Sequence, residues 1–266
     1  MTEFRIKLAK EINRTKAALC IGLDPHVDLL PYSVPRSASG ILDFSKAVVE
    51  ATYYYACCYK PNFAFWLRWG VFGLSALEDL IEYLRTYDVP VIMDMKVGDI
   101  DTSAVQYAVF VRDILQVDAV TVNPYMGTDA ISPFVRKQIF TFVLTRTSNA
   151  SAAAIQSQIV NGKTVAESVA KIALSCGDKD TIGFVVGGND VPQLTNLRQK
   201  YSDILFLVPG IGAQGADVEE VLKASCYASG STLINVGRSI IHASQHGHFA
   251  RECKRAARRY YEMLKF

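Results

Sequence analysis

A short apolar run ends in two opposite charges at Val89-Pro90-Val91-Ile92-Met93-Asp94-Met95-Lys96, and Val97-Gly98-Asp99-Ile100 follows it. The run is short, mostly apolar and opens at Pro90, which predicts a buried strand. Because side chains alternate along a strand, Asp94 and Lys96 should share one face. Two charges on an apolar strand are costly to bury unless they pair. Asp99, in the loop beyond, can add a second carboxylate to the Lys96 ammonium. A purely structural ion pair at the strand end is the alternative.

Short apolar runs of this kind recur along the chain. Eight of them occupy residues 18–23, 56–60, 90–96, 119–123, 140–145, 181–186, 204–209 and 232–236. Amphipathic segments that predict helices lie between them, at 41–53, 76–87, 102–115, 164–175, 191–201 and 216–228. Alternation of apolar strands with helices of this length predicts an α/β fold with a parallel sheet covered by helices. A closed (βα)8 TIM barrel fits best, and an open doubly wound sheet is the alternative.

Length and composition favour one compact enzyme domain over residues 1–266, because 50% of the residues are hydrophobic and 20% are charged. Helical spacing of charged and apolar residues predicts an N-terminal helix over residues 2–16 and no targeting signal. The net charge of +2 is scattered, so no nucleic-acid partner is expected. The most apolar stretch, 63–74, contains Arg68 and is too short to cross a membrane. Six cysteines without C-x-x-C spacing predict reduced thiols in a cytoplasmic protein.

Charged residues stand at the ends of the first three predicted strands. Asp24 follows the first run, Lys60 ends the second, and Asp94 and Lys96 end the third. In a parallel barrel these carboxyl ends converge on one face, where the catalytic groups of such folds lie. Four ionisable groups in one cleft indicate a functional site, whereas four unrelated surface charges are the alternative.

The last two predicted strands are followed by glycine-rich turns that suit an anion. Pro209-Gly210-Ile211-Gly212-Ala213-Gln214-Gly215 follows the seventh strand, and Gly237-Arg238-Ser239 follows the eighth. Glycines let backbone N–H groups approach an anion closely, and helix N-termini favour negative charge. These loops are the usual phosphate site of this barrel, and Arg238 can bind two phosphate oxygens at once. The sequence therefore predicts phosphate binding beside Gly237 and Arg238.

Three histidines near the C-terminus were considered as metal ligands. His242 and His246 are four residues apart, as ligands on one helix face can be, but Gly247 interrupts the turn before His248 and no cysteine is near. A solvated helix end is the favoured interpretation, so no metal site is expected.

Seven motifs follow one another along the chain: Gly22-Leu23-Asp24-Pro25-His26, Lys60-Pro61-Asn62, Asp94-Met95-Lys96-Val97-Gly98-Asp99-Ile100, Val120-Thr121-Val122-Asn123-Pro124-Tyr125, Thr147-Ser148-Asn149, Pro209-Gly210-Ile211-Gly212-Ala213-Gln214-Gly215 and Asn235-Val236-Gly237-Arg238. With these motifs the chain resembles orotidine 5′-phosphate decarboxylase, specifically the longer bacterial-type branch of that family, over nearly its whole length. The resemblance implies a TIM barrel that decarboxylates orotidine 5′-phosphate in pyrimidine biosynthesis.

The resemblance also implies roles for individual residues. Asp24 and Lys60 would hold the ribose hydroxyls, and Asp94, Lys96 and Asp99 would surround the reacting carbon.

At the other end of the substrate, Ser148 would contact the pyrimidine and Arg238 the phosphate, while Gln214 would bridge the two from a closing loop. Members of the family are homodimers with shared active sites, so Asp99 would reach into the neighbour's site. Ser103 stands where the family usually has threonine and keeps the hydroxyl. Two departures are visible in loops: Ala150 replaces a frequent proline, and 187–189 reads Gly-Gly-Asn in place of Gly-Ala-Thr.

The residue types agree with this chemistry. Loss of carbon dioxide from a pyrimidine ring leaves a carbanion, and no metal, flavin or imine-forming motif is apparent, so no cofactor is expected. Lys96 would stabilise the developing charge and deliver the proton. Two alternatives stay open: a magnesium-dependent sugar-phosphate lyase with the same Asp-x-Lys-x-x-Asp motif (a hexulose phosphate synthase or a ketogulonate phosphate decarboxylase), or a non-catalytic barrel that binds nucleotides.

Overall fold

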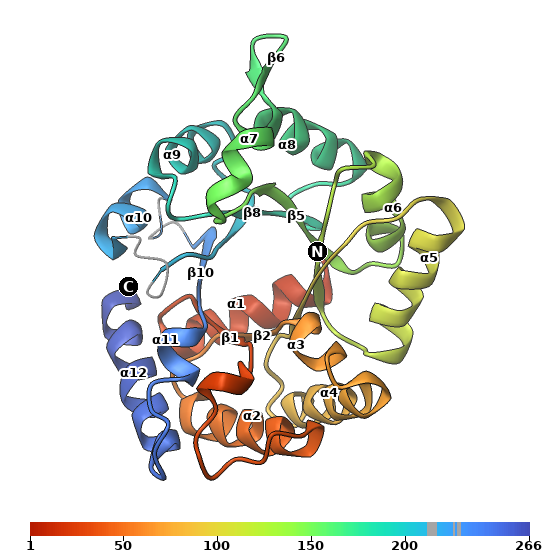
Figure 1. Cartoon of the computed structure of the whole chain (residues 1–266). Helices are drawn as coiled ribbons and strands as arrows, with labels where there is room; N and C mark the ends of the chain where they lie inside the picture. Colours follow the sequence, from red (N-terminus) through yellow and green to blue (C-terminus); the bar gives the residue numbers. More distant parts are fainter. Residues whose placement is uncertain (212–216, 226, 228–229) are drawn as a thin grey trace.

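Parallel strands pair side by side at the centre of the molecule and curl into a nearly closed barrel, with helices around it (Figure 1). This computed structural model describes residues 1–211, 217–225, 227 and 230–266. Within these residues the main sheet has eight strands in the order β2-β1-β10-β9-β8-β5-β4-β3. The predicted TIM barrel is therefore confirmed, and the open doubly wound sheet is wrong.

Each of the eight predicted apolar runs forms one strand of the barrel. Continuous apolar character suits them because both faces of a parallel sheet are buried. The strands are β1 (Leu19–Leu23), β2 (Cys58–Pro61), β3 (Ile92–Val97), β4 (Ala119–Val122), β5 (Phe140–Arg146), β8 (Ile182–Val186), β9 (Leu205–Val208) and β10 (Thr232–Val236).

The predicted helices also form, with ends that differ by a few residues. They are α1 (Glu3–Thr15), α2 (Ala38–Thr52), α4 (Gly70–Arg85), α5 (Asp101–Val109), which continues as a π-helical turn (Phe110–Ile114), α8 (Val165–Cys176), α9 (Val191–Lys200) and α10 (Val218–Ala224). Other helices were not predicted individually: α3 (Phe63–Leu67), α6 (Thr128–Arg136), α7 (Ala153–Gln156) and α11 (Arg238–Ile241). The final helix, α12 (Phe249–Leu264), is consistent with the helical spacing of Lys254, Arg255, Arg258 and Arg259, which are exposed on it. Single turns precede α2 and α7, at Val27–Leu29 and Ala150–Ala152.

A small hairpin, β6 (Ile159–Val160) and β7 (Lys163–Thr164), projects from the barrel wall near α7 and α8 (Figure 1). Asn161 and Gly162 form its turn with φ values of 52° and 75°. Asn-Gly is the strongest short hairpin signal because both turn positions require positive φ. The sequence therefore carried a signal for this hairpin that the analysis of periodicity did not use.

One side of β3 is only loosely joined to the barrel. A continuous ladder links β3 to β4, whereas toward β2 the described residues form only two isolated bridges, Tyr59 with Val91 and Asn62 with Asp94. We call the gap between β2 and β3 the seam. The strand that carries Asp94 and Lys96 is thus a boundary strand of the sheet.

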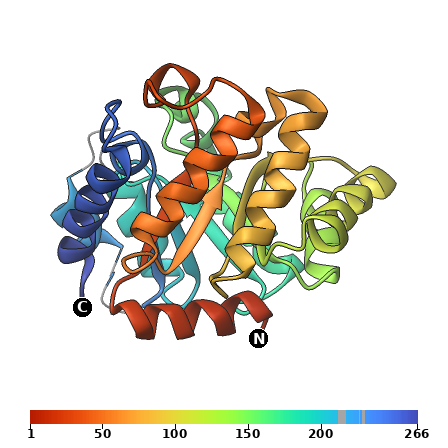
Figure 2. The same ribbon diagram turned by 90° about the horizontal axis from the view of Figure 1, so that it is seen from below.

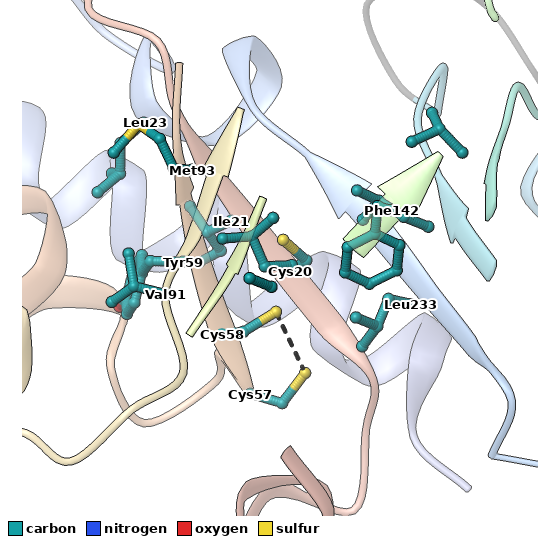
Figure 3. Packing of buried hydrophobic residues seen from close by; sticks show 14 of the residues in the cluster. Cys20, Ile21, Leu23, Cys57, Cys58, Tyr59, Val91, Met93, Phe142 and Leu233 are labelled. Atoms are coloured by element: carbon teal, nitrogen blue, oxygen red, sulfur yellow. Dashed lines mark hydrogen bonds between the residues drawn. The ribbon is translucent and has the colours of Figure 1, made fainter. Parts of the chain in front are cut away.

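Side chains from several strands fill the barrel interior (Figure 3). Cys20, Cys58 and Phe142 are completely buried there, together with Leu233 from the last strand. Burial of each large side chain stabilises the fold by roughly 1.5–3 kcal/mol. A closed barrel of this size is a packed core, so ligands must bind at its ends.

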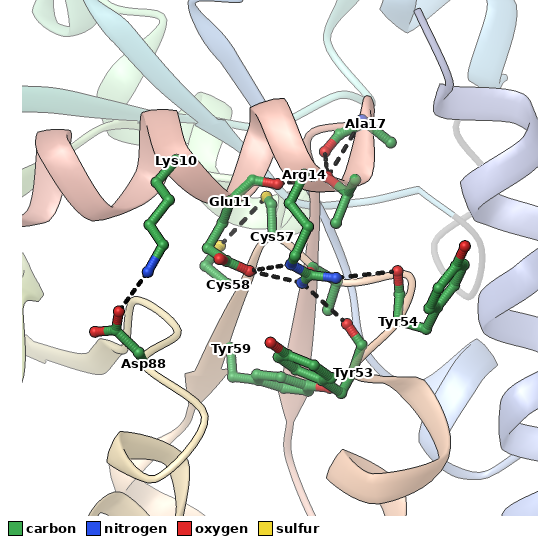
Figure 4. Close-up of polar contacts among 12 residues, drawn as sticks. Lys10, Glu11, Arg14, Ala17, Tyr53, Tyr54, Cys57, Cys58, Tyr59 and Asp88 are labelled. Carbon is green, nitrogen blue, oxygen red and sulfur yellow. Dashed lines mark hydrogen bonds and ion pairs between the residues drawn. The ribbon is translucent and has the colours of Figure 1, made fainter.

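Helix α1 crosses the end of the barrel where the strands begin (Figure 2). Arg14 is central to this contact: its guanidinium pairs with Glu11 at 2.6 Å and donates to the backbone carbonyl of Tyr53 (Figure 4). It also donates to the backbone carbonyl of Ala56. Lys10 pairs with Asp88 at 2.6 Å in the turn before β3 (Figure 4). The amino-terminal ends of the strands are therefore covered, which leaves their carboxyl ends as the open face. A search of the described residues finds no helix long and apolar enough to cross a membrane.

Candidate active site

A pocket opens at the carboxyl ends of the strands. It is lined by seven of the predicted site residues: Asp24, Lys60, Asp94, Lys96, Ser148, Gly237 and Arg238. They come from β1, β2, β3, β5 and β10 or the loops that follow these strands. Parallel pairing explains the convergence, because every strand delivers its last residues to the same face.

Three charged side chains form the centre of the pocket. Lys60 Nζ lies 2.6 Å from Asp94 Oδ2, and Lys96 Nζ lies 2.6 Å from Asp94 Oδ1. The Lys60 and Asp94 side chains are only 5% and 8% exposed, whereas that of Lys96 is 48% exposed and faces the opening. We call these residues the charged triad. It holds two ammonium groups against one carboxylate, and the Asp24 carboxylate lines the same pocket beside it.

The charged triad shifts the pKa values of its buried members. Burial alone raises the pKa of Asp94, but the nearby Lys60 and Lys96 ammonium groups outweigh it and hold that pKa well below its ordinary value. Burial alone lowers the pKa of Lys60, but Asp94 and Asp24 outweigh it and raise that pKa well above its ordinary value. Both groups therefore stay ionised at neutral pH.

Asp24 lies beside the charged triad at the end of β1. Burial is the main reason that its pKa is raised, and the Lys60 ammonium opposes that effect. Its Oδ1 is buried without a hydrogen-bond donor among the described residues. A buried carboxylate oxygen that lacks a donor and lines a pocket suits a ligand hydroxyl.

The loop after β5 carries Ser148 and is held from behind. The Asn189 side-chain amide donates to the Ser148 carbonyl at 2.8 Å. Gly187 packs so closely that a Cβ there would lie 2.8 Å from Ser148 Cα. At the loop's start, Gln156 accepts a hydrogen bond from the Thr147 backbone at 2.8 Å. From the sequence, residues 187–189 stood out only as a departure from the family pattern, and nothing pointed to Gln156.

Gly237 and Arg238 line the pocket after β10, the strand beside β1, and a Cβ on Gly237 would lie 3.6 Å from Asp24 Oδ2. Pro209 and Gly210 line the pocket as well. Among the ion pairs between described residues none includes Arg238, so its guanidinium is available to an anion. Gln214, which the sequence analysis placed over the substrate, lies outside the described residues.

Of the predicted site residues that the structure describes, Asp99 and Ser103 are the two that do not line the pocket of their own chain. The Asp99 carboxylate accepts a hydrogen bond from the backbone N–H of Ile100 at 2.8 Å. Ser103 is exposed on α5. The expected second carboxylate on Lys96 is therefore not found within one chain, because the Lys96 ammonium pairs with Asp94 and no ion pair with Asp99 is present among the described residues.

His242 does lie at a helix end, as the C-cap of α11, but its ring is half-buried among neighbouring segments, so only the expected solvation is wrong for this residue. Its Nε2 accepts the backbone N–H of His26 at 3.0 Å, its Nδ1 lies 3.1 Å from the Leu29 carbonyl, and its ring stacks on Phe44. Burial lowers the pKa of His242. The ring thus joins the loop after β1 to the segment after α11. Among the described residues, no three His, Cys, Asp or Glu side chains are grouped to hold a metal ion.

Thr121 is a pocket residue to which the sequence analysis assigned no role. It lies on β4 beside the charged triad and is 1% exposed. Its hydroxyl donates to Asp94 Oδ1 at 2.8 Å. A threonine inside an apolar strand gives no signal by itself, so only the three-dimensional arrangement identifies this contact.

Comparison with known proteins agrees with the motifs. The profile of the Orotidine 5′-phosphate decarboxylase / HUMPS family matches residues 17–253. A curated protein of Herpetosiphon aurantiacus named orotidine 5′-phosphate decarboxylase is 38% identical, over 96% of this chain and 95% of its own. The structure of Leishmania donovani UMP synthase superposes with a TM-score of 0.88 and 33% identity, over 99% of this chain and 56% of that longer chain. Leishmania donovani OMP decarboxylase superposes with a TM-score of 0.82 and 32% identity, over 98% of this chain and 99% of its own.

Proposed function

Because the chain belongs to the Orotidine 5′-phosphate decarboxylase / HUMPS family, we propose that it converts orotidine 5′-phosphate (OMP) to uridine 5′-monophosphate (UMP) and carbon dioxide in pyrimidine biosynthesis. The observation that carries this proposal is the charged triad at the open end of the barrel, with Lys96 facing the pocket. The free thiols of Cys20, Cys57 and Cys58 support a cytoplasmic location, where thiols stay reduced.

The proposed chemistry uses Lys96 as both stabiliser and acid. When the bond from C6 of the pyrimidine to the carboxylate breaks, its electron pair stays on C6 and carbon dioxide leaves. The Lys96 ammonium, held by Asp94, opposes the developing charge and then donates its proton to C6. Asp94 also places a negative charge near the departing carboxylate, and the two carboxylates repel each other before the bond breaks. How much such ground-state repulsion adds to catalysis is contested for enzymes in general.

The rest of the pocket would hold the nucleotide. Asp24 and Lys60 suit the ribose hydroxyls, since Asp24 Oδ1 is buried and without a donor among the described residues. Ser148 suits the pyrimidine, and Gly237 with Arg238 suits the phosphate. Gln214 would bridge the base and the phosphate. Binding energy from the distant phosphate can then be used to exclude water around the reacting carbon.

We also propose a homodimer in which each site borrows Asp99 and Ser103 from the partner subunit. Two observations support this. Both residues lie outside the pocket of their own chain. Apolar side chains nearby are exposed, with Tyr125 at 85% and Ile100 at 50%, as expected of a surface that a second copy covers. By this proposal, a single chain has an incomplete site.

An ultraviolet assay of OMP loss, run with and without a metal chelator, tests the function. We expect turnover that the chelator does not change. Turnover that the chelator abolishes, or activity only on a sugar phosphate, would favour the magnesium-dependent lyases. Tight binding of UMP without any turnover would favour the non-catalytic barrel. Thermal shift with UMP measures that binding independently of chemistry.

A further inference from the structure

Thr121 is hydrogen-bonded to two members of the charged triad at once. Its Oγ1 lies 2.8 Å from Asp94 Oδ1 and 3.0 Å from the backbone nitrogen of Lys96. The Lys96 N–H can only donate, and an ionised carboxylate can only accept. The one hydroxyl hydrogen of Thr121 therefore points to Asp94, while its oxygen accepts from Lys96. The direction of both hydrogen bonds is fixed by chemistry.

Lys96 needs this acceptor because β3 bulges where it carries the lysine. Met93 pairs with Val120 and Val97 pairs with Val122, so four steps along β3 match two along β4. Lys96 itself has a φ of 51°, in the left-handed region that residues with a Cβ rarely adopt. A bulge takes backbone groups out of the regular ladder. The Thr121 side chain supplies the acceptor for the Lys96 N–H at this point.

Asp94 depends on the same hydroxyl for its orientation. Its Oδ2 receives Lys60, and its Oδ1 receives both Lys96 Nζ and Thr121. Three donors fix the plane of the carboxylate. The Thr121 hydroxyl is the one uncharged donor of the three, and it comes from the neighbouring strand β4. Thr121 is therefore linked to the lysine through its backbone and to the lysine's counter-ion through its side chain.

We infer that Thr121 is a positioning residue: it holds the strained Lys96 backbone and the Asp94 carboxylate in one fixed arrangement. The inference rests on the proposed function only for its effect on turnover. The structural effect follows from the two hydrogen bonds alone. A misplacement of about 1 Å in a reacting group can cost about 100-fold in rate, so the loss of this support should be visible in kcat.

The test compares two substitutions at this position. Thr121→Val keeps the shape and removes the hydroxyl, whereas Thr121→Ser keeps the hydroxyl. We expect kcat for OMP to fall by about 10-fold to 100-fold in Thr121→Val and to stay within about threefold of wild type in Thr121→Ser. UMP affinity should change by less than about threefold in both, because Gly237 and Arg238, the residues proposed to bind the phosphate, make no hydrogen bond to Thr121. Thr141→Val is the matched control: Thr141 is equally buried on β5, and its hydroxyl bonds only the Ile139 carbonyl.

The inference is overturned if Thr121→Val keeps kcat within about threefold of wild type, or if Thr121→Ser loses as much as Thr121→Val. If Thr121→Val does not fold, Thr121→Ala removes the same hydroxyl without placing a methyl group against Asp94, and the same limits apply.

If the wild type does not turn over OMP, the proposed function fails, and a crystal structure of the variant decides this inference. Movement of Lys96 Nζ beyond about 3.5 Å from Asp94 Oδ1 supports it. An unchanged Lys96 overturns it.

Discussion

The Lys60 ammonium lies 2.6 Å from Asp94 Oδ2, and both side chains are almost completely removed from water. Loss of either charge would lower the free energy of unfolding, because removal of one partner leaves the other buried and unpaired. The pair therefore ties the ionisation of the site to the stability of the fold.

The first prediction concerns stability against pH. The pKa of Asp94 is lower in the folded protein than in the unfolded chain. Its contribution to the free energy of unfolding is therefore fully present above its ordinary pKa of about 4, and it is lost as the pH falls toward the pKa of the folded protein. The pKa of Lys60 is raised, so its contribution is present below about pH 10 and is lost as pH rises through the folded value.

Denaturant unfolding of wild type and Asp94→Asn between pH 3 and pH 7 measures this. The difference in unfolding free energy should shrink below about pH 4, with a slope that approaches about 1.4 kcal/mol per pH unit. Asp203→Asn is the control, because Asp203 is exposed and its ion pair with Lys179 is long, at 3.8 Å. A difference for Asp94→Asn that does not vary with pH would contradict the pairing.

The second prediction concerns Lys96. Lys96→Ala should lose at least about 100-fold in kcat for OMP and keep its fold, because the side chain faces the pocket and is half exposed. Turnover and thermal unfolding are measured together. Lys137→Ala removes a comparable lysine, 2.7 Å from Asp113 on the surface, and should change neither. More than about a tenth of wild-type turnover in Lys96→Ala excludes the proposed role.

The third prediction concerns Arg238. Arg238→Ala should weaken UMP binding and slow turnover, because phosphate binding energy supports the chemical step. Calorimetry measures the affinity, and added guanidinium should restore part of the turnover. Arg258→Ala is the control, since Arg258 is exposed and 3.9 Å from Glu262. Unchanged UMP affinity in Arg238→Ala would show that the phosphate binds elsewhere.

The fourth prediction tests the shared site. Lys96→Ala and Asp99→Ala should each be nearly inactive as homodimers. In a mixed dimer one site carries both defects and the other carries neither, so a statistical mixture should recover about a quarter of wild-type activity after joint refolding. Activity is followed as subunits exchange.

A mixture of Lys96→Ala with Asp94→Ala is the control for that experiment. Both residues serve their own chain's site, so each mixed dimer still has one defect in each site and no activity should return. If Lys96→Ala and Asp99→Ala together recover nothing while each still binds UMP, Asp99 acts within its own chain.

The fifth prediction concerns the support behind Ser148. Gly187→Ala should displace the Ser148 loop, because the new Cβ would lie 2.8 Å from Ser148 Cα. Overpacking of this kind costs about 1–3 kcal/mol, so we expect lower thermal stability and at least about tenfold lower kcat/KM. Gly247→Ala has no atom within 4 Å of its new Cβ and should match wild type. Wild-type kinetics in Gly187→Ala would show that the loop tolerates the shift.

The strands of the barrel could be predicted because each is a continuous apolar run. Short elements could not: α3 and α7 contain five and four residues, too few to show a helical period. Pro133 inside α6 also argued against a helix there. The Asn161-Gly162 turn was predictable from its residue types, but a search for long periodic segments does not detect it.

Within the site, the sequence indicated which charges meet but not how the backbone carries them. Simple alternation placed Asp94 and Lys96 on one face, and they do meet, but through a bulge and a left-handed Lys96 that alternation does not contain. Asp99 was expected near Lys96 from its position in the loop after the strand, and it forms no ion pair with Lys96 among the described residues. Thr121 and Asn189 contribute through contacts between segments far apart in sequence, for which a single sequence gives no signal.

The seam between β2 and β3 has a consequence for how this site can evolve. The Lys60 and Asp94 side chains bridge the seam, where the described residues form only two isolated backbone bridges. In a lineage that no longer needed the reaction, loss of Lys60 or Asp94 would still destabilise the fold. Substitutions of the half-exposed Lys96 would be tolerated. We expect a mutant library selected only for folded protein to retain Lys60 and Asp94 and to lose Lys96, which deep sequencing would reveal. Barrel closure would thus preserve most of a catalytic centre through periods without selection for catalysis.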